Sequence, residues 1–454
     1  FTFNINGTGS VIPKFSAIGT PVNGATLEVG RTYTIQAVQD FNTGYIFTNW
    51  TASWVGQSTT VLQSNVLSIS FTMQSNMVMS ANYITNPFAI YEGVYNGLFH
   101  EASEIKNQSA GYVTMKATSK FAYSGKLLVD GDAVPFSGKF RIDGTADRVV
   151  SRAKILKSDI ELSMALDFAG GSDTVTGTLV NTTEGWTATM VADRAVFGLA
   201  NPATQYTNAY TMAIPGFASN NDGPVGTGYG LVSVDTLGKI KLSGAMGDGH
   251  AVKQGSTVSK NGKWALFAPL YVQPRTIVVG GVPKVLKEAQ GFVMGWMNFN
   301  PNTPAGTTNL APLGDVVWIK TEWTNTTYTA GFTNEVAVKS SRWYPGALHG
   351  APTETPLATT NQVATVSEGN LVAPFDASLL VTTNKVLTVA PVANNFKPAL
   401  VIKFGQVKGT FTHPDNANAI TKWAGVLLQD HDIGAGSFMG PSLSGDIQIA
   451  PPAP

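Results

Sequence analysis

The segment Thr32-Tyr33-Thr34-Ile35-Gln36-Ala37-Val38 decides the fold class, because polar and apolar residues alternate along it. The segment Leu67-Ser68-Ile69-Ser70-Phe71-Thr72-Met73 repeats this alternation. A period of two places every second side chain on one face of a β-strand, whereas an amphipathic helix needs apolar residues at i, i+3, i+4 and i+7. No long stretch has the helical spacing, and turn residues recur about every 8–12 positions, as in sandwiches and barrels. We therefore expect an all-β protein.

Composition narrows the class of protein further. The chain has 454 residues, of which 43% are hydrophobic and only 13% are charged. At roughly 100–200 residues per domain, this length predicts two to four domains. Lys plus Arg and Asp plus Glu both number 29, so the chain has no net charge and no long-range field to attract a nucleic acid. The absence of cysteine from the sequence excludes disulfides and Cys-ligated metal centres.

Several features favour the outside of a bacterial cell. Charge is low, and Thr, Ser, Asn and Gly are abundant. No run of about 18 apolar residues predicts a transmembrane helix. Phe1 opens directly into an alternating strand, without an initiator Met or a signal peptide, which we interpret as a processed or trimmed terminus. We therefore expect a secreted or cell-surface protein.

Residues 1–86 form the first predicted unit. It contains a Gly7-Thr8-Gly9 turn, the strand from Leu27 to Ile35, the run from Gly44 to Trp50, and a closing segment from Phe71 to Tyr83. This order resembles the divergent InlB B-repeat family of bacterial surface proteins. Its matching patterns are G-x-G, L-x-V-G-x-x-Y-x-I, G-Y-x-F-x-x-W and F-T-M-x-x-N-x-x-x-x-A-N-[FY]. The resemblance implies a small β-rich spacer or interaction module.

The rest of the chain repeats a weaker pattern of a strand, a Gly-containing strand, a polar turn and a returning strand. The copies begin at Gly111, Gly228 and Val386. This repetition predicts a β-meander that curls into one or two barrels or sandwiches. We divide it into residues 87–300, a barrel or sandwich, and residues 301–454, the second half of that structure or a further β domain. Pro301–Pro312 and Pro345–Pro374 are predicted to be loops or an interdomain crossing.

A second resemblance concerns this larger region. Tyr95-Asn96-Gly97-Leu98-Phe99 and the run from Gly425 to Gly440 are similar to a domain of large exported proteins from Verrucomicrobia and related bacteria. That resemblance implies export and a β architecture. It implies no activity and no active residues.

Two Asp-rich segments are the first candidates for a metal or acid–base site. Asp130-Gly131-Asp132 begins like a calcium loop, but apolar residues follow it, so a hairpin turn explains it better. Asp430-His431-Asp432 follows an apolar run, and alternate residues of a strand point to opposite faces, so we interpret it as a solvated turn. Gly247-Asp248-Gly249-His250 and Asp415-Asn416 are interpreted as hairpin turns, like Asp130-Gly131-Asp132. We expect no metal and no cofactor.

Sequence motifs give no support to catalysis. The chain has no G-x-S-x-G nucleophile motif, and Gly223–Gly230 lacks the Lys-Ser/Thr ending of a phosphate loop. A glycosidase needs two carboxylates across a cleft, and no pattern marks such a pair. We therefore do not expect an enzyme.

Aromatic residues are the remaining candidates for ligand binding. The chain has 9 Trp, 13 Tyr and 23 Phe, and aromatic faces stack on sugar rings. Trp318, Trp323 and Trp343 are the candidate stacking residues. Trp318 and Trp323 are five positions apart, so on a regular strand they face opposite ways and at least one belongs to the core.

Three functions remain open at this point. The first is a non-enzymatic structural or adhesive protein of a surface, whose partners are further copies of the chain joined through sheet edges or termini. The second is a carbohydrate-binding module with a polysaccharide partner. The third is a polysaccharide-active enzyme with an unmarked acidic pair. Ordered self-assembly, glycan binding without turnover, and product release would distinguish them.

Overall fold

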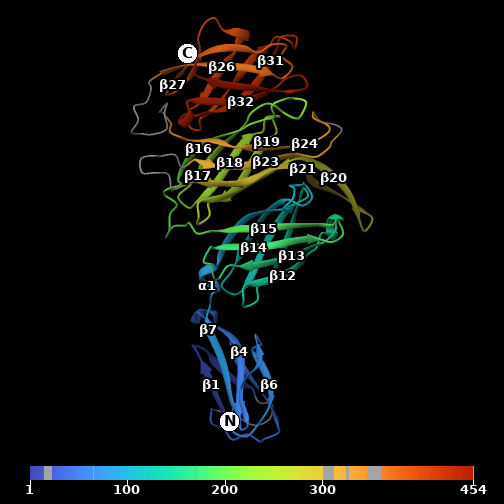
Figure 1. Ribbon diagram of the computed structural model, residues 1–454, viewed down its shortest axis with the longest axis vertical. Coiled ribbons are helices and arrows are strands. Elements are labelled where there is room, and N and C mark those ends of the chain that lie inside the picture. The colour runs from blue at the N-terminus through green and yellow to red at the C-terminus, as the bar shows by residue number, and fades with distance from the viewer. Residues whose placement is uncertain are drawn as a thin grey trace.

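Four β units follow one another along the chain and form an elongated molecule (Figure 1). The computed structural model describes residues 1–14, 23–64, 66–168, 170–299, 311–323, 327–345 and 359–452. Strands dominate these residues, so the prediction of an all-β fold is confirmed. In the part of the chain that is described, no helix is long and apolar enough to span a membrane.

The N-terminal unit contains two sheets, ordered β1-β7-β4-β5 and β2-β3-β6. The strands are β1 Thr2–Asn6, β2 Ser10–Lys14, β3 Thr32–Val38, β4 Tyr45–Trp54, β5 Gln57–Ser64, β6 Ser68–Thr72 and β7 Val78–Thr85. The two alternating segments that predicted the fold become β3 and β6, and these strands pair directly with Ile35 opposite Ile69. Their inward residues join Phe47, Trp50 and Met79 in one apolar core.

Residues 93–195 form a barrel-like sheet of eight antiparallel strands, called here the first barrel. Its strands are β8 Gly93–His100, β9 Gly111–Ala117, β10 Ala122–Val129, β11 Asp132–Lys139, β12 Thr145–Val150, β13 Ile160–Leu166, β14 Thr174–Asn181 and β15 Trp186–Ala195. Consecutive strands pair with each other, except β11 with β12, and the last strand, β15, pairs with the first, β8. The inward residues, including Tyr95, Leu127 and Trp186, fill the interior.

Residues 208–343 form the second barrel in the same manner. Its main strands are β16 Asn208–Ile214, β17 Gly228–Val234, β18 Lys239–Ala245, β19 Ala251–Thr257, β20 Lys263–Val279, β21 Val282–Phe299, β23 Asp315–Lys320, β24 Phe332–Ala337 and β25 Lys339–Trp343, with the short β22 Pro312–Leu313. The strands form two sheets, ordered β19-β18-β17-β16-β25 and β20-β21-β23-β24, with β22 paired to β21. Only Val338 separates β24 from β25, and β25 pairs with β16.

Residues 359–450 form the third barrel. Its strands are β26 Thr359–Glu368, β27 Phe375–Thr382, β28 Val386–Thr388, β29 Lys397–Val401, β30 Gln406–His413, β31 Ala419–Leu428, β32 Ile433–Met439 and β33 Ser444–Ala450. Here too the first strand pairs with the last, β26 with β33. In each of the three barrels, the first strand therefore pairs with the last.

These pairings divide the chain differently from the predicted units 87–300 and 301–454. The chain passes residue 300 and returns to the second barrel, where β23 pairs with β21 and β25 pairs with β16. The first two predicted repeat copies start on equivalent strands, β9 and β17, each the second strand of its barrel. The third copy starts at β28, the third strand of its barrel, so it is displaced relative to the others. Much of Pro301–Pro312 and Pro345–Pro374 lies outside the described residues.

Apolar side chains pack neighbouring barrels against each other. Between the first and second barrels, Leu98 and Tyr112 contact the outer face formed by Phe267, Phe292 and Ile319. Between the second and third barrels, Ala213 and Tyr229 belong to one cluster with Val426, Leu428 and Ala435. The N-terminal unit has a narrower contact, in which Phe41 meets Phe121 edge to face. The short helix α1 Phe88–Tyr91 follows this junction.

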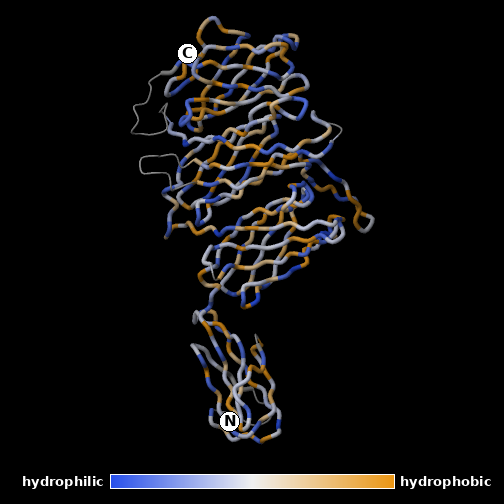
Figure 2. Tube along the Cα trace, viewed as in Figure 1, coloured by the Kyte–Doolittle hydropathy of each residue, from blue (hydrophilic) through white to orange (hydrophobic). Residues whose placement is uncertain are grey.

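The hairpin of β20 and β21 extends beyond the second barrel (Figure 2). Its base packs against the first barrel, where the Ala289 N–H donates to the Gly131 carbonyl at 3.1 Å. Its tip turns at Gly280 and Gly281, both with positive φ, as a two-residue hairpin turn requires. Exposed valines surround this turn, namely Val278, Val279, Val282 and Val285.

Candidate functional site

The Asp130-Gly131-Asp132 segment is a hairpin turn between β10 and β11, as predicted. Its two carboxylates converge on the ammonium group of Lys157. Lys157 Nζ lies 2.8 Å from Asp130 Oδ2 and 2.8 Å from Asp132 Oδ2. A third carboxylate oxygen, Glu288 Oε1 from β21, lies 2.6 Å from the same nitrogen. The position between these acids is therefore held by a cation of the chain itself.

Arg152 extends this set of charges. It is fully buried, and it reaches Glu184 Oε1 at 2.9 Å and Asp130 Oδ2 at 3.4 Å. Arg275 of β20 completes the set, with its Nε 3.3 Å from Glu288 Oε2. We call these seven residues the junction network: Asp130, Asp132, Arg152, Lys157, Glu184, Arg275 and Glu288. It joins the first barrel to the second.

Burial and hydrogen bonds set the protonation states in the junction network. Loss of solvent lowers the pKa of Lys157, but the hydrogen bonds that its ammonium group donates to Asp130, Asp132 and Glu288 outweigh that effect and leave the pKa raised. Burial opposes ionisation of Glu184, yet hydrogen bonds from Ser158 and Trp186 and the charge of Arg152 bring its pKa below the usual value. Both groups are held in their charged forms.

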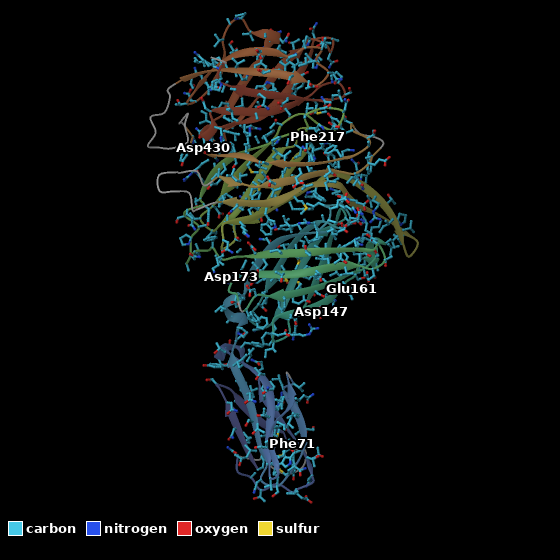
Figure 3. The ribbon with its side chains drawn as sticks, in the orientation of Figure 1. Phe71, Asp147, Glu161, Asp173, Phe217 and Asp430 are labelled. Atoms are coloured by element: carbon cyan, nitrogen blue, oxygen red, sulfur yellow. The ribbon has the colours of Figure 1, made fainter. Side chains whose placement is uncertain are left out.

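Asp173, labelled in Figure 3, provides a second charged link between the first two barrels. It is buried, and it pairs with Arg194 of β15 and with Lys260, which precedes β20. The Lys260 N–H also donates to the Arg194 carbonyl at 3.0 Å. Asp173 therefore has a cationic partner on each of the two barrels.

Asp430-His431-Asp432 lies at the boundary between the second and third barrels (Figure 3). Its first two residues belong to a 3₁₀ turn, Gln429–His431. Asp430 Oδ2 accepts hydrogen bonds from Ser341 Oγ at 2.9 Å and from the Arg342 N–H at 3.0 Å. Gln362 Nε2 donates to Asp432 Oδ1 at 3.1 Å. The turn therefore fastens the closing strand β25 to the third barrel, and the described residues contain no group of His, Asp and Glu arranged to hold a metal.

A buried series of hydrogen-bonded side chains in the second barrel has no signal in the local sequence. Tyr271 Oη donates to Asp248 Oδ2 at 2.6 Å and accepts from Trp318 Nε1 at 2.9 Å. Burial raises the pKa of Tyr271, and the neighbouring Asp248 carboxylate raises it further. Lys320 is buried nearby and donates to the Tyr328 carbonyl at 3.0 Å, and burial lowers its pKa. The Tyr271 hydroxyl donates its proton to Asp248, so each of the two groups has a hydrogen-bond partner inside the barrel.

The three candidate stacking tryptophans lie in different environments. Trp318 is 0% exposed in the core of the second barrel. Trp343 is 2% exposed, and its Nε1 donates to the Ile402 carbonyl at 2.6 Å. Trp323 is half-buried after β23. In these positions neither Trp318 nor Trp343 offers a ring face to a sugar, because other side chains cover both rings.

Two open hollows lie on the seam between the second and third barrels. One has a volume of about 950 Å³ and is bounded by Tyr229, Ala245 and Gly249 of the second barrel and by β29–β32 of the third. The other has a volume of about 520 Å³ and lies over β17–β19, beside Phe404 of the third barrel. The two hollows adjoin each other. Tyr229 and Gln406 line the larger hollow, and the smaller hollow is lined by Leu231 and Phe404, each two residues away along the same barrel. We call the two hollows together the seam groove.

Lysines carry all the charge of the seam groove. They are Lys241 of β18, Lys253 of β19, Lys397 of β29, Lys408 of β30 and Lys422 of β31. Within the part of the chain that is described, no Asp or Glu lines either hollow. All five side chains are exposed. A surface of this kind attracts anions.

No protein-family model matches this chain, and no curated protein matches it.

Proposed function

We propose that this chain is a non-enzymatic structural and adhesive protein of an extracellular surface. The observation that carries this proposal is the way in which the three barrels are joined. Each boundary between barrels combines a buried apolar cluster with polar links contributed by both barrels. Such boundaries favour one fixed arrangement, which suits a rigid spacer that holds a binding surface away from its anchor.

The charged and polar groups support a structural role for the same boundaries. The carboxylates of Asp130, Asp132 and Glu288 face Lys157, and Asp430 holds strand β25. A catalytic acid or base must be able to reach a substrate, whereas these groups are saturated by partners within the chain. The chain's expected bacterial surface location belongs to the same proposal.

The tip of the β20–β21 hairpin is the proposed adhesive contact between copies of the chain. Val282 and Val285 are 66% and 65% exposed and lie on opposite faces of the ribbon. Among the described strands, the outer part of this ribbon pairs only with itself, so both its edges offer free backbone groups. Equivalent edges of two copies can pair with each other about a twofold axis, and valine favours such pairing.

Light scattering across a range of concentrations tests this contact. We expect the whole chain to form larger species as concentration rises, and the double variant Val282→Lys, Val285→Lys to remain monomeric, because like charges oppose edge pairing. The control is Val149→Lys, which changes a 55% exposed valine on the first barrel and should leave assembly unchanged.

A monomer at every concentration, or unchanged assembly in the double variant, would contradict adhesion through the hairpin tip. Incubation with a panel of polysaccharides tests the other half of the proposal. Release of shortened products in proportion to the amount of protein would show that the chain is an enzyme.

A further inference from the structure

We propose that the seam groove binds an acidic polysaccharide, a sugar polymer that carries carboxylate or sulfate groups. This inference goes beyond the structural role, because a rigid spacer does not require a basic groove. The proposal rests on the charge, the arrangement and the shape of the groove lining.

The charge of the groove stands out against the neutrality of the chain. Lys plus Arg equals Asp plus Glu over the whole sequence, yet the groove has five lysines and, among the described residues, no lining carboxylate. Within the same described residues, none of the five lysines forms an ion pair. Their positive charge is therefore available to a ligand.

Three of these lysines lie together on the outer face of the third barrel. Thr410 of β30 pairs with Lys397 on one side and with Lys422 on the other. Lys408 lies two residues before Thr410, on the same face, so it is diagonal to both. Diagonal neighbours on a sheet are about 7–8 Å apart at Cα, within reach of long side chains. The three ammonium groups repel one another, and a shared anion would relieve that repulsion.

Two further lysines extend the positive surface onto the second barrel. Lys253 pairs with Ser243, and Lys241 lies two residues before Ser243 on the same face. Lysines therefore lie on both sides of the contact in which Gln406 Nε2 donates to Tyr229 Oη at 3.1 Å. Charges distributed along a seam in this manner match the repeated charges of a polymer better than one compact anion.

The uncharged lining suits sugars. Thr410, Asn416 and Ser243 present hydroxyl and amide groups at the groove surface, where they can exchange hydrogen bonds with sugar hydroxyls. Phe404 is 41% exposed and Ile420 is 77% exposed, and both line the groove. These apolar surfaces can cover the C–H face of a sugar ring, which gives the lining both kinds of contact that a glycan needs.

A single-stranded nucleic acid fits this lining less well. Nucleic-acid channels combine positive charge with a series of aromatic platforms for successive bases, often together with arginine. The groove lining contains no arginine, and Phe404 is its one strongly exposed aromatic ring among the described residues. A nucleic acid is therefore an alternative outcome of the test.

The direct test measures binding of the whole chain to polygalacturonate and to chondroitin sulfate at low ionic strength, with dextran as the neutral polymer. The groove variant is Lys397→Gln, Lys408→Gln, Lys422→Gln. The matched control is Lys116→Gln, Lys126→Gln, Lys139→Gln, which removes three exposed lysines from the outer face of β9–β11 in the first barrel. Both variants have the same net charge, so only the position of the lost charges differs.

We expect at least one acidic polymer to bind and dextran not to bind. The groove variant should lose about tenfold or more in affinity, because three charge contacts are removed together, and the control should lose less than about threefold. Which acidic polymer binds distinguishes carboxylate from sulfate recognition. Added salt should lower the affinity of the wild-type protein more steeply than the affinity of the groove variant.

A second groove variant tests the proposal if the variant Lys397→Gln, Lys408→Gln, Lys422→Gln does not fold. Lys241→Gln, Lys253→Gln changes only the second barrel and should also weaken binding. Equal losses in the groove and control variants would show diffuse charge attraction and would overturn the proposal. Failure of both acidic polymers to bind, or tighter binding of single-stranded DNA than of either polymer, would overturn it as well.

Discussion

The junction network and the seam groove both use lysine, but in opposite ways. Lys157 is 12% exposed at its side chain and touches three carboxylates contributed by two barrels. Lys408 is exposed and, among the described residues, the lining around it contains no carboxylate. The first lysine is part of the structure that holds two barrels together. The second remains hydrated and available at the surface.

Desolvation explains this difference. A charge removed from water needs opposite charges and hydrogen bonds around it, or its burial is strongly unfavourable. An exposed ammonium group keeps its water and needs no partner within the chain. A neutral total charge is compatible with both arrangements, so net charge alone does not describe the electrostatics of either region.

The substitution Lys157→Met should have the largest effect. It leaves the carboxylates of Asp130, Asp132 and Glu288 close together without their shared cation, and breaking a buried ion pair costs about 3–5 kcal/mol. Denaturant unfolding should show this loss of stability. The control Lys126→Met changes an exposed lysine of the same barrel and should shift stability by no more than about 0.5 kcal/mol. Equal effects would show that Lys157 does not hold the junction.

Acid should weaken the junction through Glu184. Its pKa is lower in the folded chain than the usual value, so its stabilising contribution is complete above that usual value and is lost as pH falls through the folded value. Melting temperatures of the original chain and of Glu184→Gln should differ at about pH 7 and converge toward about pH 3. A difference that stays constant over this range would contradict the assigned role of Glu184.

The smallest effect is expected from Lys408→Gln in the groove. The substitution removes a like-charge neighbour of Lys397 and Lys422, so stability should stay within about 0.5 kcal/mol of the original, with any change toward greater stability. Thermal unfolding at low ionic strength measures this most sensitively, because salt screens the repulsion. A large loss of stability would mean that Lys408 has a structural partner.

The alternating segments predicted strands β3 and β6 correctly because that pattern is local. The Asp130–Asp132 turn was also predicted, for the same reason. The partner of these aspartates was not predictable, since Lys157 is 27 residues from Asp130 and Glu288 is 131 residues from Lys157. A local sequence pattern does not predict which strands of two separate barrels will contact each other.

The same limit explains the predicted boundary near residue 300 and the choice of tryptophans. The segment Pro301–Pro312 has the composition of an interdomain crossing, yet the chain returns from it to complete the second barrel through β25. Trp318 and Trp343 were candidates by residue type alone, and closure of the barrels buries both. The seam groove was not predicted, because its lysines come from five strands of two barrels.

Hydrogen–deuterium exchange with and without an acidic polysaccharide tests the central claim most directly, because it monitors both regions in one experiment. The claim is that the lysines of the seam groove are free for a ligand, whereas Lys157 of the junction network is fully engaged by carboxylates of the chain. With polygalacturonate or chondroitin sulfate added, we predict slower exchange in β17–β19 and β29–β32, with no change at the Asp130–Asp132 turn. Protection at that turn or at β9–β11, or no protection anywhere, would contradict the claim.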